Sequence, residues 1–178
     1  MQLSLVMPLA SAEGVLFASD VDAVAKRISA LGRRYVVVDG FTGAGKSTFA
    51  ESLAASLQLP WVELDSLLPP PEAVQDESYV ERLDLQALGR LLESAQGAVI
   101  EGIQPWDALS GIVARTDATA VYLARCSNPA GSLIWHDGVR IEDGDGEGGN
   151  WLDRCELEYH RRVRPHQDAD VLVVRISE

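Results

Sequence analysis

The 178-residue sequence predicts an α/β fold, with a doubly wound parallel sheet of about five strands and helices on both faces. Two observations lead to this fold class. Short apolar runs that are typical of strands alternate along the chain with longer stretches in which apolar residues recur at helical spacing. One of these runs, Tyr35–Val38, is apolar throughout, as strands covered on both faces of a sheet usually are.

The expected helices are recognised by apolar stripes and by capping residues at their ends. Val24 and Ile28 belong to such a stripe in the first helix, which Gly32 ends, and Leu88 and Leu92 belong to one in the third. In chain order the helices cover Ser19–Leu31, capped by Ser19 or Asp20, then Lys46–Gln58, Asp84 to about Ala95, Trp106–Ala114, Pro129–Asp137, and Asn150 to Pro165.

The expected strands are apolar runs that lie between these helices. They cover Tyr35–Val38, Trp61–Leu64, Ala98–Ile103, Thr119–Leu123 and Val171–Ile176. The connection after the second strand, Leu67–Glu77, contains three consecutive prolines and must be a loop.

We expect residues 1–178 to form a single domain, in which residues 1–33 are an N-terminal extension and helix. Residues 138–149, with five glycines and four acids, are expected to form a flexible, lid-like loop.

The strand Tyr35–Val38 leads directly into Gly40–Ser47, which matches the pattern G-x-x-x-x-G-K-S of the phosphate-binding P-loop. Its glycines allow the backbone N–H groups to point at a phosphate chain, and the following helix adds its positive N-terminal end. The context of strand, loop and helix predicts a three-layer P-loop NTPase fold. The expected nucleotide-binding residues are Gly40, Thr42, Gly43, Ala44, Gly45, Lys46, Ser47 and Thr48.

Two acids lie at or near the ends of expected strands, where a parallel sheet collects its ligand-binding residues. Asp65 follows Trp61–Leu64, and Glu101 lies within Ala98–Ile103. Phosphoryl transfer needs a metal ion, a group that orients the acceptor hydroxyl, and cations around the transferred phosphoryl group. We therefore predict Asp65 as the base or acceptor-orienting group, and Ser47, Asp65 and Glu101 as the Mg²⁺ site. An acid that merely starts a turn is the alternative for Asp65.

Several segments resemble the uridine kinase and phosphoribulokinase-like branch of the P-loop kinases. They are Val38-Asp39-Gly40 before the loop, Leu64-Asp65-Ser66, Leu83-Asp84-Leu85, Ile100-Glu101-Gly102-Ile103, Arg164-Pro165 and Ala169-Asp170-Val171. The resemblance implies a nucleoside kinase fold, ATP as phosphate donor, and Asp65 as base and metal-shell ligand. The family's arginine-rich lid falls on Ser132–Asp137, which contains no arginine. Arg125 and Arg140 are candidate replacements, and Arg140 is predicted to be catalytic together with Lys46 and Asp65.

Composition limits the classes of partner. The net charge of −12 argues against nucleic acid and anionic membranes as partners. No run approaches the roughly 20 apolar residues of a membrane span, and the N-terminal segment lacks the basic start of a signal peptide. We therefore expect a cytoplasmic protein that binds a small molecule, and its oligomeric state stays open.

The expected function is ATP- and Mg²⁺-dependent transfer of the γ-phosphate to a hydroxyl of a small molecule, such as a nucleoside or related metabolite. The alternative is an ATP-binding switch or partner-binding module that hydrolyses ATP weakly and has no small-molecule acceptor. The lack of arginine in Ser132–Asp137 favours this alternative. The acceptor, and the choice between ATP and GTP, stay open at this point.

Overall fold

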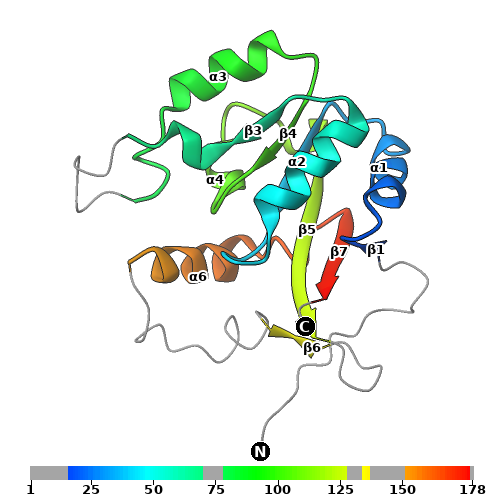
Figure 1. The fold of residues 1–178 in the computed structure, drawn as a ribbon. Coiled ribbons are helices and arrows are strands. Elements are labelled where there is room, and N and C mark those ends of the chain that lie inside the picture. The colour runs from blue at the N-terminus through cyan, green and yellow to red at the C-terminus, as the bar shows by residue number, and fades with distance from the viewer. Residues whose placement is uncertain (1–15, 70–77, 128–133, 137–150, 177–178) are drawn as a thin grey trace, which may run out of the picture.

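The computed structural model describes residues 16–69, 78–127, 134–136 and 151–176 (Figure 1). Its strands are β1 (Leu16–Phe17), β2 (Tyr35–Asp39), β3 (Trp61–Glu63), β4 (Ala98–Glu101), β5 (Ala118–Ser127), β6 (Ile134–Trp135) and β7 (Val171–Ile176). Its helices are α1 (Val21–Ser29), α2 (Lys46–Leu57), α3 (Leu85–Ser94), α4 (Pro105–Ala108) and α6 (Trp151–Val163), with short 3₁₀ helices η1 (Leu64–Leu67) and η2 (Arg115–Asp117).

The described strands form one sheet in the order β1-β7-β5-β2-β4-β3, and all pairs along this path are parallel. β2, which leads into the P-loop, lies between β5 and β4.

All five strands expected from the sequence are present. Two further strands were not expected: β1 pairs with β7 at one edge, and β6 pairs antiparallel with the end of β5. Both contain only two residues, so the sequence carries almost no periodicity to reveal them.

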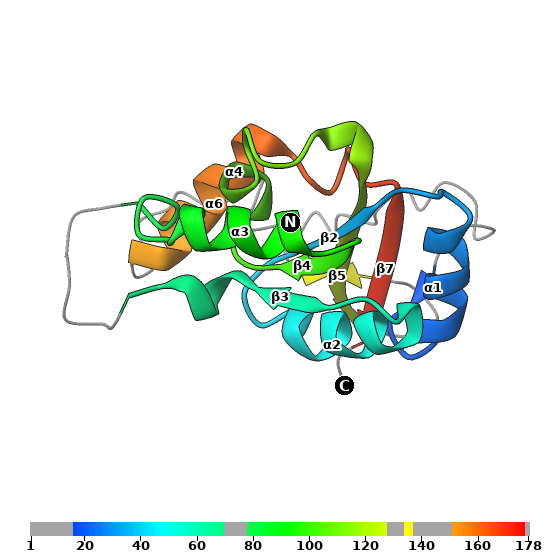
Figure 2. The same cartoon turned by 90° about the horizontal axis from the view of Figure 1, so that it is seen from above.

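Helices cover both faces of the sheet, which confirms the doubly wound arrangement. α1 and α2 lie on one face, and α3, α4 and α6 lie on the other (Figure 2). The alternation of side chains along β2 serves both layers, because Val36 and Val38 belong to the core under α1 and α2, whereas Tyr35 and Val37 belong to the core under α3 and α4. This explains why the strand is apolar at every position before Asp39.

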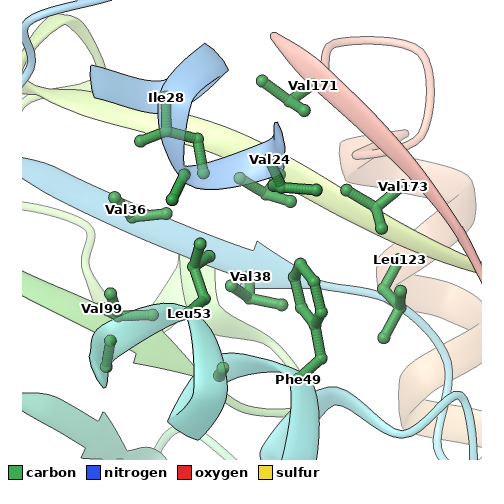
Figure 3. Close-up of a cluster of buried hydrophobic side chains, with 14 of the residues drawn as sticks. Val24, Ile28, Val36, Val38, Phe49, Leu53, Val99, Leu123, Val171 and Val173 are labelled. Carbon is green, nitrogen blue, oxygen red and sulfur yellow. The ribbon is translucent and has the colours of Figure 1, made fainter. Parts of the chain in front are cut away.

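The core between the sheet and the first two helices anchors the start of α2. Leu53 and Phe49 of α2 pack against the β-branched residues of β2 and against Val24 of α1 (Figure 3). Leu53 is fully buried, a burial that contributes about 1.5–3 kcal/mol for a leucine side chain. The helix that follows the P-loop is therefore fixed to the central strand by apolar packing.

Aspartates cap two of the helices, as expected. Asp20 accepts a hydrogen bond from the N–H of Ala23 at 3.1 Å, and Asp84 accepts one from Ala87 at 2.8 Å. Each bond satisfies an amide that the first turn of a helix leaves without a partner. Capping is local chemistry, so the sequence reveals it reliably.

Two elements differ most in length from their expected ranges. The helix expected over Trp106–Ala114 is the shorter α4, with Pro105 at its first turn, and the chain soon turns at Gly111 with φ of +78°. β5 continues to Ser127, four residues beyond its expected end, because residues 124–126 pair with 174–176 of β7. Both differences come from backbone geometry and pairing that side-chain patterns do not show.

The helix expected over Pro129–Asp137 is wrong at two of the three residues that can be compared, because only His136 is helical. Residues 134–135 are strand β6, in which Trp135 is paired with Cys126. Trp135 is buried and packs edge-on against Tyr122, with ring centroids 6.0 Å apart. The extended end of β5 offers backbone partners that outweigh the local helical preference. Residues 128–133 and 137 lie outside the described residues.

Other expectations fall outside the described residues. They concern the N-terminal segment 1–15, most of the proline loop (70–77), and the lid-like loop 138–149 with Arg140. Within the part of the chain that the structure describes, no helix has the length and apolar character needed to cross a membrane.

Candidate active site

The P-loop connects the end of β2 to the start of α2, and two of its glycines are required by geometry. Gly40 has φ of +148°, and a Cβ atom there would lie 2.5 Å from the carbonyl oxygen of Leu123 on the neighbouring strand. Gly45 has φ of +90° and forms the N-cap of α2. Any other residue would be strained at either position, so these glycines fix the path of the loop.

Lys46, the first residue of α2, folds back over this loop. Its ammonium donates a hydrogen bond to the carbonyl oxygen of Gly40 at 2.6 Å, and the side chain is only 7% exposed. A buried ammonium needs acceptors around it, and a single carbonyl uses one of its three protons. The ammonium is thus placed at the loop with capacity to bind an anionic ligand.

Ser47, in the first turn of α2, meets Glu101 at the carboxyl end of β4. Glu101 is the last residue of β4 and lies in register with Val38 of β2, and its carboxylate is hydrogen bonded to the Ser47 side chain. Burial raises the pKa of Glu101, and the nearby carboxylates of Asp65 and Glu63 add to this rise. The Ser47 hydrogen bond and the Lys46 charge oppose it.

Asp65 lies in η1, directly after β3, with Tyr79 beside it. The Tyr79 hydroxyl donates a hydrogen bond to a carboxylate oxygen of Asp65. Burial raises the pKa of Tyr79, and the Asp65 carboxylate adds to this rise, so the phenol remains a proton donor. The bond fixes one oxygen of Asp65. Sequence reasoning did not single out Tyr79, because it lies 14 residues from its partner.

A pocket of about 350 Å³ brings most of the predicted residues together. It is lined by Thr42, Gly43, Gly45, Lys46, Ser47, Thr48, Asp65, Glu101, Gly102, Ile103 and Leu152. Gly40 and Ala44 belong to the same loop, and Ala44 is fully buried behind it. The pocket therefore joins an amide-lined, positively charged wall to a wall with two carboxylates.

A second hollow of about 390 Å³ lies beside the P-loop and has a more apolar lining. Its walls are Phe17, Ala18, Ser19, Val21, Gly45, Thr48, Phe49, Ser52, Val174, Arg175 and Ile176. Gly45 and Thr48 line both hollows, so the two adjoin at the start of α2. Phe17 and Ile176 are 43% and 40% exposed, which leaves apolar surface open at this hollow.

Two arginines from adjacent strands lie against the P-loop. Arg175 of β7 donates to the carbonyl oxygen of Ala44 at 3.0 Å. Arg125 is its register partner within β5, and its guanidinium would lie 3.5 Å from a Cβ atom placed on Gly43. Arg125 was expected after the fourth strand and is instead part of it. Both guanidinium groups add positive charge beside the loop.

A buried polar cluster joins α6 to the P-loop, and sequence reasoning missed it. Asp39 accepts hydrogen bonds from the N–H of Gly40 at 2.7 Å and from the Tyr159 hydroxyl. Glu156 accepts two bonds from Thr42, one from its N–H at 2.6 Å and one from its hydroxyl at 3.1 Å. Asp39 and Glu156 are 1% and 0% exposed, so two carboxylates lie buried behind the loop.

His160 completes this cluster. Its Nε2 lies 3.7 Å from a carboxylate oxygen of Asp39, and its Nδ1 lies 2.9 Å from the carbonyl oxygen of Glu156. Because a carbonyl only accepts, Nδ1 must carry a proton. The imidazole also stacks on Phe41 of the P-loop, with ring centroids 4.0 Å apart. Several contacts therefore hold α6 against the loop.

A signal for this cluster exists in the sequence. Asp39 follows a fully apolar strand and precedes the first glycine of the P-loop, so burial of its carboxylate can be inferred. Glu156 lies four residues after Leu152 and three before Tyr159, which places it on the inward face of its helix. What the sequence cannot show is which element this face meets.

Comparison with solved structures identifies the fold. A possible uridine kinase from Bacillus stearothermophilus matches 87% of this chain and 97% of its own, with 18% identity and a TM-score of 0.55. A gluconokinase from Sinorhizobium meliloti matches 81% of this chain and 83% of its own, with 19% identity and a TM-score of 0.47. A shikimate kinase from Aquifex aeolicus matches 79% of this chain and 85% of its own, with 22% identity and a TM-score of 0.49.

The first of these likenesses shows that the chain has the fold of the P-loop kinases, in an arrangement similar to that of the possible uridine kinase. No protein-family model matches the sequence, and no curated protein does. The function therefore has to be inferred from the site itself.

Proposed function

We propose that this protein is a small-molecule kinase, which transfers the γ-phosphate of ATP to a hydroxyl group of its substrate. The observation that carries the proposal is one pocket with two unlike walls. Lys46 and the loop amides form a wall suited to phosphate, and Asp65 belongs to the wall that carries the two carboxylates. A phosphate donor and a hydroxyl acceptor need these two kinds of wall at short separation.

The two adjoining hollows accommodate the two ends of the donor. With its phosphates in the P-loop, a nucleotide can place its base in the apolar hollow beside Phe17 and Ile176, where an aromatic ring supports stacking. Its terminal phosphate then faces the pocket that contains Asp65 and Glu101. This direction follows from the lining, because apolar walls suit a base and the carboxylates can hold the cation that the phosphates need between themselves and other negative charges.

The residues present fit a magnesium ion. The Ser47 hydroxyl and the carboxylates of Glu101 and Asp65 are hard oxygen donors, the type that Mg²⁺ prefers, and the Ser47–Glu101 hydrogen bond holds the first two together. We propose these three residues as its site, directly or through water. When bound, the ion neutralises charge on the phosphates during transfer.

Asp65 then orients the acceptor. The acceptor oxygen forms a bond to the γ-phosphorus while the bond from that phosphorus to the bridging oxygen of ADP breaks, and the hydroxyl proton passes to the carboxylate of Asp65. The Tyr79 hydroxyl holds one oxygen of Asp65, which leaves the other for the acceptor. Lys46 stabilises the charge that develops on the leaving phosphate. Arg140 is proposed to add a further cation.

The pocket and the charge of the chain limit the acceptor. Ile103 and Leu152 give the acceptor side an apolar surface next to its carboxylates. This combination suits a small hydroxylated molecule with an apolar part, and nucleosides or related metabolites agree with the resemblance in sequence. The net charge of −12 disfavours a nucleic-acid substrate. We place such an enzyme in the cytoplasm, where ATP is available.

The proposal is tested by incubating the protein with Mg·ATP and a panel of nucleosides, sugars and related polyols. We expect phosphorylated product with at least one acceptor and matched formation of ADP, followed by mass spectrometry and by coupled detection of ADP. Binding of ATP without a phosphorylated product from any class of hydroxyl compound would instead support a nucleotide-dependent switch.

A further inference from the structure

The two buried carboxylates behind the P-loop have no part in the transfer step. Asp39 holds the amide of the first P-loop glycine, and Glu156 holds the amide and hydroxyl of Thr42 two residues later. Neither side chain lines the pocket that contains Asp65 and Glu101. Their contacts are with the backbone that would hold the phosphates, so their function has to be sought in that backbone.

The carboxylate pair lies in a position that a bound phosphate would affect strongly. Lys46 is a nearby cation, and it reaches the loop through the carbonyl oxygen of Gly40, the residue directly after Asp39. Phosphates compete for the same ammonium and bring their own negative charge. Both effects make a second buried negative charge behind the loop more costly.

Within the part of the chain that the structure describes, few other charged groups surround Asp39. The titratable or charged groups that face it are Lys46 from α2, Glu156, Tyr159 and His160 from α6, and its register partner Tyr122 from β5. On β4, Glu101 lies beside the preceding residue, Val38. Burial raises the pKa of Asp39 to about 7, and the Glu156 charge adds to this rise. The Tyr159 hydroxyl, Lys46 and the Gly40 N–H act in the opposite direction.

We propose that Asp39 and Glu156 are positioning residues of the P-loop, and that phosphates bind while this pair carries one proton, held by Asp39. The inference rests on the proposed binding of a nucleotide. A protonated Asp39 can still accept from Gly40 with one oxygen, so the loop keeps its geometry while one negative charge is removed. Glu156 remains charged and holds Thr42 in place.

The sign of the linkage follows from these charges. Nucleotide phosphates raise the pKa of Asp39 further, so the bound state carries more proton than the free state near neutral pH. Binding is therefore accompanied by proton uptake and becomes tighter as the pH falls through this range. Below about pH 6, Asp39 is already protonated in the free protein and the uptake vanishes.

Calorimetric titration of the full chain with Mg·ADP, in two buffers of different ionisation enthalpy, measures the protons taken up. We expect uptake of between roughly a third and three quarters of a proton per nucleotide at about pH 7.5, and less than roughly a tenth at about pH 6. Asp39→Asn keeps the hydrogen-bonding shape and should bind nucleotide with no uptake. Asp84→Asn, a matched control at the cap of α3, should behave as the wild type, since asparagine caps equally well.

Positioning by Glu156 is tested separately with two substitutions. Glu156→Ala removes the acceptor for Thr42 and should weaken Mg·ADP binding about tenfold, the cost of a buried donor left without a partner. Glu156→Gln still offers an oxygen and should restore most of the affinity. If the alanine variant does not fold, the comparison of glutamine with the wild type and the proton count remain.

The outcomes separate this inference from the proposed function. Heat of binding that is the same in both buffers at pH 7.5 would overturn the proton uptake while leaving nucleotide binding intact. Uptake that persists in Asp39→Asn would assign the proton elsewhere and overturn the role of Asp39. Wild-type affinity in Glu156→Ala would overturn its positioning role. Absence of any binding heat would contradict nucleotide binding itself, and with it both proposals.

Discussion

The Lys46→Ala variant is expected to lose at least about a hundredfold in turnover while the chain stays folded, because Lys46 is the cation held over the P-loop. Its ammonium is buried and bonded to Gly40, so alanine leaves a small gap and removes a desolvated charge. The packing of Leu53 and Phe49 fixes α2 independently. Initial rates with saturating acceptor, together with circular dichroism, measure the two effects separately.

The matched control is Lys26→Ala, which removes an exposed lysine from the last turn of α1. This substitution should leave the rate within about twofold of the wild type, since an exposed charge contributes little. If Lys46→Ala and Lys26→Ala turn over equally fast, Lys46 has no part in the transfer step.

Asp65→Asn is expected to lower the rate of transfer by about a hundredfold or more while nucleotide affinity changes less than about threefold. General base catalysis typically contributes factors of this size, and asparagine cannot take the acceptor proton. The amide oxygen can still accept from Tyr79, so the local structure should survive. Single-turnover rates, compared with Kd for Mg·ATP from calorimetry, separate the two quantities.

Tyr79→Phe is the informative companion to this variant. It keeps the carboxylate and removes the hydrogen bond that holds one of its oxygens, so we expect a smaller loss of rate than in Asp65→Asn. Should Asp65→Asn weaken transfer and nucleotide binding by the same factor, Asp65 would be assigned to the metal or to the fold and not to the acceptor.

Local chemistry made much of the fold predictable from the sequence. The aspartate caps of α1 and α3 each act within three residues, and the glycines of the P-loop are required by backbone angles near their own positions. Asp65 and Glu101 were found because the topology of a parallel sheet brings the ends of neighbouring strands together. Their meeting in one pocket with Lys46 agrees with that reasoning.

The elements that the sequence could not reveal depend on partners far along the chain. Glu156 meets Thr42 across 114 residues, and Tyr159 meets Asp39 across 120. Arg162 is another example, because it forms an ion pair with Asp107 of α4, which lies 55 residues away in the chain. A single sequence records which face of α6 is polar or apolar, but it does not record what that face packs against.

The central claim is that the main-chain amides between Gly40 and Thr48 bind the phosphates of a nucleotide. Calorimetric titration with Mg·ATP, alongside thermal unfolding with and without the nucleotide, tests it most directly. We expect saturable binding heat with one site, and stabilisation of the folded chain that grows with nucleotide concentration. Titration without heat, together with an unfolding temperature that excess Mg·ATP leaves unchanged, would contradict the claim.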